Sequence, residues 1–283
     1  MKHLQNKKAL LTGAASGIGL ALSQALAAQG VDLWLVDIDQ AGLELAANMA
    51  RQHNVEVVTD SCDLAEPSQI DALVERIKSE WGALHILINN AAVGFYGSIW
   101  VMTQEQWDHL LNVNLHAPIQ LIRLLLPTLV VQDDAHIVNI SSILGLSTYR
   151  KATAYQTSKY AMVGLSESLR MEYAGTNLAV SVICPGFVQG TQFYASMIKP
   201  DPQHAKRKVP DWLCCTPQTV ASKTITAIRR NRGLTVVTRV PPLLWWLKRL
   251  SPWAADRFYQ WGYGWSRRRR EKRKVKRSSE SDV

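Results

Sequence analysis

Short apolar runs alternate with longer amphipathic segments between residues 8 and 184. Uninterrupted apolar runs are typical of parallel strands that are buried on both faces of a sheet. The segments between them have the length of helices, and no internal repeat with a period of 20–50 residues breaks the alternation. The pattern therefore predicts a doubly wound parallel sheet in a three-layer α/β/α arrangement. The predicted strands are 8–11, 31–36, 55–59, 84–88, 137–140 and 178–184.

The predicted helices fill the spaces between these strands. One runs from a glycine-rich turn to about residue 29, a second covers 41–53, and a third opens at Glu66-Pro67, where proline suits a first helical position. A long helix is predicted over 103–131, and Pro118 and Pro127 are expected to bend it. A further helix contains Tyr155 and Lys159.

The composition divides the chain at about residue 240. The 283 residues are 47% hydrophobic, which is ordinary for a globular core, and residues 1–240 are predicted to form one α/β domain. Residues 243–265 hold five of the 10 tryptophans, and residues 267–277 carry nine basic side chains and one acidic one. We therefore expect 241–283 to be an aromatic and basic extension whose end is disordered.

Charge and cysteine usage exclude several classes of protein. The net charge is +9, but residues 267–283 contribute +6 of it, so the first 266 residues are nearly neutral at +3 and do not indicate nucleic-acid binding. The four cysteines lack CxxC or Cys/His metal spacing, so no metal site is predicted and a reduced, cytosolic setting is expected. The N-terminus has no apolar stretch of the signal-peptide kind, and no uninterrupted apolar run predicts a transmembrane helix.

A candidate catalytic group follows the strand 137–140. Tyr155 and Lys159 are four residues apart, so on a helix they lie on one face about 6 Å from each other. A nearby cation lowers the pKa of a phenol, so Tyr155 can act as a general acid or base. Ser142, at the end of the strand, can hold a carbonyl or alcohol oxygen while the proton moves. Taken alone, the pair is also consistent with a packed ring beside a solvated charge.

The first strand and helix enclose the sequence TGAASGIG at 12–19. Glycines allow the tight turn and a close approach to a pyrophosphate, and the N-terminus of the helix presents unpaired N–H groups to it. A glycine-rich turn that only joins two elements remains the alternative. The second strand ends in Asp37, where a carboxylate accepts hydrogen bonds from ribose hydroxyls and repels a 2′-phosphate, so NAD is favoured over NADP. Strand-end aspartates also serve as caps, and Asp39 competes for that role.

Polar and small residues follow the other strand ends. Asp63, after the third strand, can contact adenine or can cap a helix. Asn89 and Asn90 precede two alanines, a combination that suggests backbone bracing and cofactor contact. Because ligands bind at the carboxyl ends of the strands in such sheets, these residues are expected to share one site. Asn114 and the sequence Pro185-Gly186 complete the set.

Together these residues resemble the short-chain dehydrogenase/reductase family, in its single-domain branch of about 250 residues with a Rossmann fold, over residues 5–240. The resemblance implies that Tyr155 is the acid/base, that Ser142 holds the oxygen, that Lys159 lowers the pKa of the tyrosine and binds the nicotinamide ribose, and that Asn114 anchors a relay water. It implies that the cofactor is bound by Gly13, Ser16, Gly17, Ile18, Gly19, Asp37, Asp63, Leu64, Asn90, Ala91, Ala92, Tyr155, Lys159, Pro185, Gly186, Val188 and Thr191. The family pattern PGxVxT is shifted, because Gly190 stands at the threonine position and Thr191 follows it.

The expected function is NAD-dependent interconversion of a secondary, lipophilic alcohol and its carbonyl. A non-catalytic NAD-binding or scaffold protein and an NADPH-dependent carbonyl reductase are the alternatives. Segment 191–216 is expected to cover the site, and Phe193, Tyr194, Met197, Ile198 and Trp212 make it apolar. The basic run at 206–208 either meets an acidic substrate group or forms a solvated loop.

Two further expectations concern membrane binding by the C-terminal extension and the oligomeric state. Tryptophan, tyrosine and basic side chains favour the headgroup level of a bilayer, so 243–277 is expected to bind an anionic membrane surface, which would place a cytoplasmic protein on the inner face of a membrane. The alternative is that the tryptophans cover the active site or a neighbouring subunit. A homodimer or homotetramer is implied by the resemblance alone.

Overall fold

The computed structural model describes residues 1–198, 210–238, 243–258 and 260–262. The chain divides into two compact units, Met1–Val240 and Pro241–Val283, which are described separately. The basic run at 206–208 and all residues beyond 262 lie outside the described residues.

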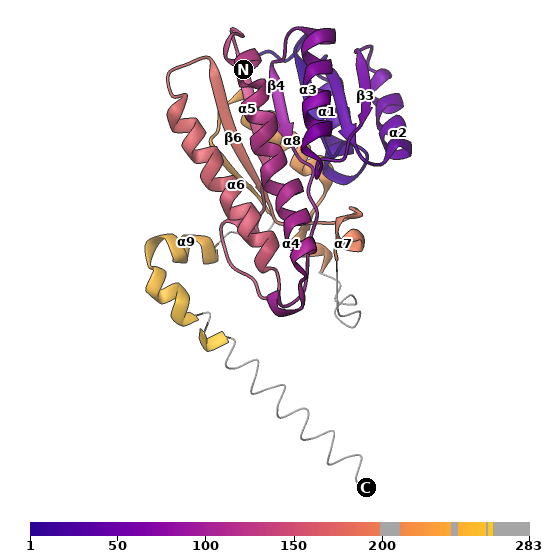
Figure 1. Cartoon of the computed structure of the whole chain (residues 1–283). Helices are drawn as coiled ribbons and strands as arrows, with labels where there is room; N and C mark the ends of the chain where they lie inside the picture. The colour runs from indigo at the N-terminus through magenta and orange to yellow at the C-terminus, as the bar shows by residue number, and fades with distance from the viewer. Residues whose placement is uncertain (199–209, 239–242, 259, 263–283) are drawn as a thin grey trace. The chain divides into compact units, whose positions relative to one another are not determined.

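The first unit is built on one seven-stranded sheet in the order β3-β2-β1-β4-β5-β6-β9, with every neighbouring pair parallel (Figure 1). The order reverses between β1 and β4, and ligands bind at such a switch point in open α/β sheets. A small two-stranded sheet pairs β7 (Phe187–Val188) with β8 (Cys214–Cys215). The prediction of a doubly wound parallel sheet is thus confirmed. The strands of the large sheet are β1 (Lys8–Thr12), β2 (Asp32–Asp37), β3 (Val57–Ser61), β4 (Ile86–Asn89), β5 (Ala135–Ile140), β6 (Leu178–Pro185) and β9 (Leu234–Val237).

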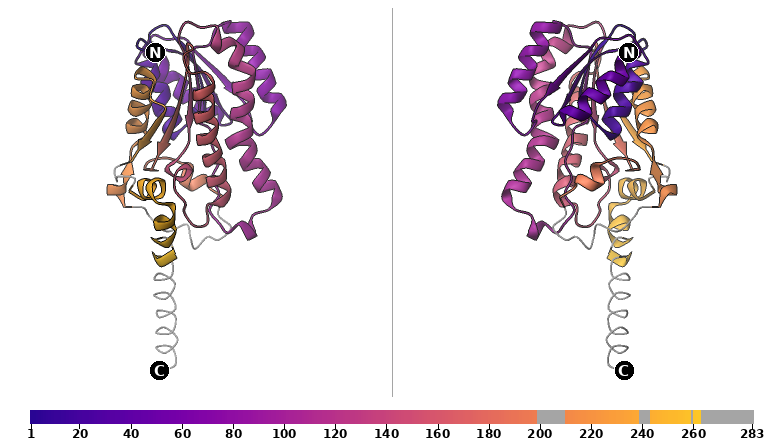
Figure 2. Two further views of the ribbon diagram at one scale, coloured as in Figure 1. Left: turned by 90° about the vertical axis from the view of Figure 1, so that its left-hand side faces the viewer. Right: turned by 90° about the vertical axis from the view of Figure 1, so that its right-hand side faces the viewer.

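Helices cover both faces of this sheet (Figure 2). One layer contains α1 (Gly17–Ala27), α2 (Gln40–Arg51) and α8 (Pro217–Arg229), whose apolar residues pack with Leu11, Leu33 and Leu35 in one core cluster. The other contains α3 (Pro67–Trp81), α5 (Ala117–Val130) and α6 (Thr153–Glu172), which enclose Leu10 and Leu87 in a second cluster. Because side chains from both faces of the strands are buried, the runs read as continuously apolar in the sequence.

The long helix predicted over 103–131 is a single helical run with a different interruption from the one expected. A π-helical segment, Asn112–His116, joins α4 (Gln104–Leu111) to α5, and the N–H of Ala117 donates to the carbonyl of Asn112. Pro118 has no N–H to donate to the carbonyl of Asn114, so the local pattern widens before the proline. The structure thus shows a π-helical widening centred on Asn114 before Pro118, and the bends predicted at Pro118 and Pro127 stay predictions.

This helical run, Gln104–Val130, is long and apolar enough to cross a membrane by length and composition only, a test that the core helices of soluble proteins also pass. In the structure, however, 44% of its apolar window is buried inside the protein. Leu121, Leu125 and Leu129 of α5 belong to the core cluster that also contains residues of α3. The buried face of this helical run therefore packs in the core of the fold.

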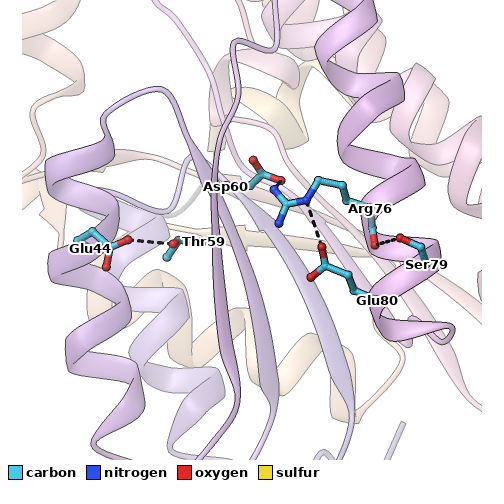
Figure 3. Close-up of polar contacts among 6 residues, drawn as sticks. All are labelled: Glu44, Thr59, Asp60, Arg76, Ser79 and Glu80. Atoms are coloured by element: carbon cyan, nitrogen blue, oxygen red, sulfur yellow. Dashed lines mark hydrogen bonds and ion pairs between the residues drawn. The ribbon is translucent and has the colours of Figure 1, made fainter.

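Polar contacts fasten the edge strand β3 to the helices beside it (Figure 3). The Thr59 hydroxyl donates to Glu44 of α2 at 2.9 Å, and Arg76 of α3 donates to Asp60 at 2.7 Å and to Glu80 at 3.2 Å. Burial raises the pKa of the Asp60 carboxyl, and this effect exceeds the lowering by Arg76. These contacts hold the edge strand β3 in place, which among the described strands pairs with β2 alone.

The second unit contains α9 (Leu243–Leu250) and a further helical stretch at 252–258. Three of its described tryptophans are exposed, at 50% for Trp246, 71% for Trp253 and 70% for Trp261. Arg249 stacks 5.5 Å from the ring centre of Trp245, and Arg257 lies 5.2 Å from that of Trp253. Aromatic rings and cationic groups are therefore interleaved along this unit.

Candidate active site

One cavity of about 1240 Å³ lies at the carboxyl ends of the central strands, where it is bordered by the residues that follow β1, β2, β4, β5 and β6. It is large enough for a dinucleotide and a substrate together. The structure brings most of the predicted site residues to this cavity. They are Gly13, Ser16, Gly17, Ile18, Asp37, Asp63, Leu64, Asn90, Ala91, Ala92, Ser142, Tyr155, Lys159, Pro185, Gly186, Val188 and Thr191. Asn114 and Gly19 do not line it.

The glycines of the first turn are required by backbone geometry. Gly13 and Gly17 have φ angles of 67° and 54°, a region that favours glycine. A Cβ on Gly19 would lie 1.8 Å from the carbonyl oxygen of Gly13, so only glycine allows the helix to pack against the turn. Ser16 is the N-cap of α1, and its side chain makes no capping hydrogen bond. The N-terminus of α1 therefore faces the cavity with its first N–H groups available to an anion.

Asn90 braces this turn from β4. Its side-chain amide donates to the carbonyls of Thr12 and Gly13 at 3.0 and 2.9 Å, and the Thr12 hydroxyl accepts from the N–H groups of Asn90 and Ala91. Asn89 has a different role, because its amide donates to Asn139 inside the sheet at 2.8 Å. Of the asparagine pair, only Asn90 lines the cavity.

The Asp37 carboxylate is oriented by two backbone donors. It accepts from the N–H of Ala15 at 2.9 Å and from that of Asp39 at 3.1 Å. Asp39 accepts from the N–H of Gly42 and caps α2, and both aspartates line the cavity. Asp63 accepts from the N–H of Ala65 at 2.8 Å and lines the cavity, but the N-cap of α3 is Glu66, so Asp63 does not cap that helix.

The predicted catalytic groups converge at the other end of the cavity. Ser142, Tyr155 and Lys159 are 8%, 8% and 3% exposed, and all three line it. The Lys159 ammonium donates to the carbonyl of Ile140 at 3.0 Å and lies 5.7 Å from the centre of the Tyr155 ring. Burial lowers the pKa of Lys159 to about 8. The cation is therefore close to the phenol ring, and its charge is lost above neutral pH.

Two residues that the sequence analysis did not single out hold α6 in this position. The Ser141 hydroxyl donates to the main-chain carbonyl of Lys159 at 2.8 Å. A Cβ on Gly145 would lie 2.6 Å from that same carbonyl oxygen and 2.7 Å from the Ser141 oxygen, so the loop approaches the helix closely. In the sequence, only the presence of Ser141 next to Ser142 could have signalled this contact.

Asn114 is buried at 1% exposure and acts through its neighbours. Its side chain accepts from the N–H of Val93 at 2.8 Å and donates to the carbonyl of Val93 at 2.9 Å and to Ser158 at 3.2 Å. Ser158 in turn donates to the carbonyl of Tyr155. Asn114 thus links the loop after β4 to the helix that carries Tyr155, and its predicted role as a water anchor remains a prediction.

The one-residue shift of the threonine after Pro185-Gly186 changes where Thr191 lies. Gly190 has a φ of 71°, and the Thr191 side chain lies against the glycine turn, 3.2 Å from where a Cβ of Gly17 would be. The extra residue therefore places Thr191 beside the glycine turn. The predicted contact of Thr191 with the cofactor stays a prediction.

An apolar wall faces Tyr155, and most of its members were not predicted. Phe193, Met197 and Leu213 come from segment 191–216, while the remaining residues come from the stretches after β4 and β5 and would not stand out in a sequence. The ring of Phe193 lies 5.5 Å from that of Tyr155. Trp212, which was expected here, is 67% exposed and does not line the cavity. The other wall residues are Val93, Tyr96, Ile143, Leu144, Tyr149 and Leu213.

The residues fit a nicotinamide dinucleotide. The glycine turn and the open N-terminus of α1 suit a pyrophosphate, and the fixed Asp37 carboxylate suits ribose hydroxyls. Within the described residues, no group of three or more His, Cys, Asp or Glu side chains has the geometry to hold a metal ion.

Comparison with known proteins agrees with this geometry. Residues 7–201 match the short chain dehydrogenase family. The ketoacyl reductase HetN of Nostoc sp. is 29% identical over 267 residues, which cover 92% of this chain and 91% of that protein. A short-chain dehydrogenase/reductase from Burkholderia phymatum, solved with NAD, has a TM-score of 0.75 and 29% identity over 83% of this chain and 90% of its own.

A second solved structure, a short-chain dehydrogenase from Sphingobium yanoikuyae in complex with NADPH, has a TM-score of 0.73 and 26% identity over 81% of this chain and 87% of its own. The family match covers six of the seven strands of the large sheet, β1 to β6, together with the glycine turn and the Tyr155–Lys159 pair. The chain therefore belongs to the short-chain dehydrogenase/reductase family and is an oxidoreductase that acts with NAD(P).

Proposed function

We propose that this protein is an NAD-linked dehydrogenase that interconverts a secondary, lipophilic alcohol and the corresponding carbonyl. The main support is that Ser142, Tyr155 and Lys159 meet in one cavity whose opposite end holds the Asp37 carboxylate. The apolar wall beside Tyr155 supports a lipophilic substrate. The test is NAD-dependent turnover on a panel of sterols, retinoids, long-chain alcohols and small polyols, in which turnover of the polyols alone would reject the lipophilic assignment.

In this proposal the chain supplies the proton and the geometry, and the bound nicotinamide supplies the hydride chemistry. The Tyr155 phenol exchanges a proton with the substrate oxygen, while the Ser142 hydroxyl donates a hydrogen bond to that oxygen. The Lys159 ammonium stabilises the phenolate form of Tyr155. Because the pKa of Lys159 is about 8, this assistance is complete at pH values well below 8 and declines above it. Oxidation is the proposed physiological direction.

The first prediction concerns the cofactor. NAD is expected to give a higher kcat/KM than NADP, because the fixed Asp37 carboxylate would face the additional 2′-phosphate. Like-charge contacts of this kind cost several kcal/mol, and each 1.4 kcal/mol corresponds to about tenfold in affinity. Asp37→Asn retains an oxygen for the Ala15 N–H but removes the charge, so it should narrow the NAD/NADP ratio by roughly tenfold or more. A clear preference of the wild-type enzyme for NADP would support a carbonyl reductase instead.

We further propose that the second unit attaches the protein to the inner, anionic face of a membrane. Exposed Trp246, Trp253 and Trp261, interleaved with Arg249 and Arg257, support this placement. Tryptophan rings favour the interfacial region, and basic residues near an anionic surface contribute about 1 kcal/mol each. A peripheral attachment of this kind would bring the cavity to a lipophilic substrate.

The membrane prediction is tested by flotation with liposomes that contain anionic lipid. The full chain should float at low salt, and the truncated chain 1–240, one of the two compact units, should remain in the soluble fraction. High salt should weaken binding of the full chain because it screens the basic residues. If the full chain stays soluble at low salt, the tryptophans serve as a cover or a subunit interface instead.

A homodimer or homotetramer is part of the same proposal and rests on the family resemblance. Light scattering of the purified chain, in detergent and without it, measures the assembly.

A further inference from the structure

A short segment lies against Tyr155 and is joined to the loop after β4 by two backbone hydrogen bonds. This cover segment, residues 191–198, contains α7 (Phe193–Ser196) and ends in a parallel bridge between Phe95 and Ile198. The N–H of Tyr96 donates to the carbonyl of Ile198, and the N–H of Ile198 donates to the carbonyl of Gly94, both at 3.0 Å. The cover is thereby joined to the loop that follows β4.

Gly94 leaves room at this junction for the side chains of Met197 and Phe193, because it has no side chain of its own. A Cβ at this position would lie 2.7 Å from Cγ of Met197 and 2.9 Å from Cζ of Phe193, both closer than side-chain atoms normally approach. Gly94 is not among the glycines with a positive φ, so its backbone conformation is open to any residue. An added side chain at position 94 would therefore displace the side chains of the cover segment that now occupy this space.

The seated cover determines the surroundings of Tyr155. The rings of Phe193 and Tyr155 lie 5.5 Å apart with a tilt of 51°. Phe193 and Ile198 pack against the apolar cluster that contains Phe95, Leu110 and Tyr155. Phe193 and Met197 also line the cavity, so the same side chains that fill the space at Gly94 form the wall that a substrate would contact.

We propose that Gly94 is a positioning and specificity-determining residue, which sets the depth of the substrate site by admitting Met197 and Phe193 and so seating the cover on Tyr155. This inference rests on the proposed dehydrogenase function for its substrate. A side chain at position 94 pushes the wall outward, which loosens the fit to compact substrates and leaves the cofactor end of the cavity unchanged.

Gly94→Ala is expected to raise KM for a compact alcohol by about tenfold, with a smaller change in kcat, and to leave the Kd for NAD unchanged. The preference should move towards bulkier alcohols. Gly164→Ala is the matched control, because Gly164 lies within α6 and a Cβ there meets nothing within 4 Å. The control should keep wild-type KM values.

A double-mutant cycle identifies the contact responsible. Met197→Ala removes Cγ and Cε, two of the three atoms nearest to the Cβ position of residue 94. Gly94→Ala should therefore raise KM much less in the Met197→Ala background than in the wild-type background. Equal effects in the two backgrounds, or no effect of Gly94→Ala on KM, would overturn the proposal.

Hydrogen–deuterium exchange separates this inference from the proposed function. The amides of Tyr96 and Ile198 are hydrogen-bonded across the junction, so peptides that contain them should exchange at least about tenfold faster in Gly94→Ala than in the wild type or in Gly164→Ala. This measurement needs no substrate. Unchanged exchange means that Gly94 does not seat the cover, whereas faster exchange in a chain without turnover would reject only the dehydrogenase function.

Discussion

Tyr155→Phe should lower the NAD-dependent turnover of a good substrate by about a thousandfold and leave the Kd for NAD unchanged, because it removes the phenol oxygen that accepts the proton of the alcohol. The ring itself is 8% exposed and packs in an apolar cluster with Phe95 and Leu110, so phenylalanine fits the same space. Paired measurements of kcat and of NAD affinity by titration calorimetry would separate the chemical step from binding.

Tyr160→Phe provides the control, since Tyr160 lies on the same helix and does not line the cavity. It removes the same atom and should retain turnover. Full turnover by Tyr155→Phe would refute the assignment of the acid/base. A wild-type protein that binds NAD but turns over no member of the alcohol and carbonyl panel would instead favour the non-catalytic alternative.

The pH profile carries a related expectation for Lys159. Burial lowers the pKa of this group from 10.5 to about 8, so its folded-state pKa lies below its unfolded value. The charged form is therefore disfavoured by folding, and this group makes the folded protein more stable as pH rises from about 8 towards 10.5. Deprotonation of Lys159 also removes the cation beside Tyr155. As pH rises through this window, the folded protein therefore becomes more stable while Lys159 ceases to stabilise the phenolate form of Tyr155.

The sheet and one end of the site were predictable because parallel strands bring distant residues to one edge. Residues after β1, β2, β4 and β5 are separated by tens of positions in the sequence, yet each follows a strand that ends at the same edge. Short apolar runs that end in Asp37, Asn90 or Ser142 therefore predicted a shared cavity without any knowledge of contacts. The helical spacing of Tyr155 and Lys159 predicted their proximity in the same way.

The other features of the site could not be predicted, because they depend on contacts between residues that are distant in the sequence. Asn114 was expected at the site, but its side chain is committed to Val93 and Ser158, a pairing between the loop after β4 and α6. The π-helical segment around it depends on how Pro118 changes one turn of helix, which a proline in a helical pattern does not specify. The residues around Gly94 in the sequence do not indicate its importance either, because that importance depends on Met197, about a hundred residues later.

Gly19→Ala should be the most damaging single-methyl substitution in the cofactor site. The added Cβ would lie 1.8 Å from the Gly13 oxygen, 2.7 Å from its carbonyl carbon and 2.9 Å from Cα of Ala14, all of them backbone atoms that no side-chain rotation can move. The glycine turn or the start of α1 must shift, and overpacking of this kind costs about 3 kcal/mol or more.

Because the displaced turn is the one that would face the pyrophosphate, the Kd for NAD should rise by roughly a hundredfold. Calorimetric titration with NAD and the thermal unfolding midpoint measure the two effects. Gly17→Ala, in which the Cβ would meet the Thr191 methyl carbon at 3.2 Å, should fall between Gly19→Ala and the neutral Gly164→Ala. If Gly19→Ala bound NAD as tightly as Gly164→Ala, the glycine turn would not be the pyrophosphate site, and the assignment of this end of the cavity would have to be abandoned.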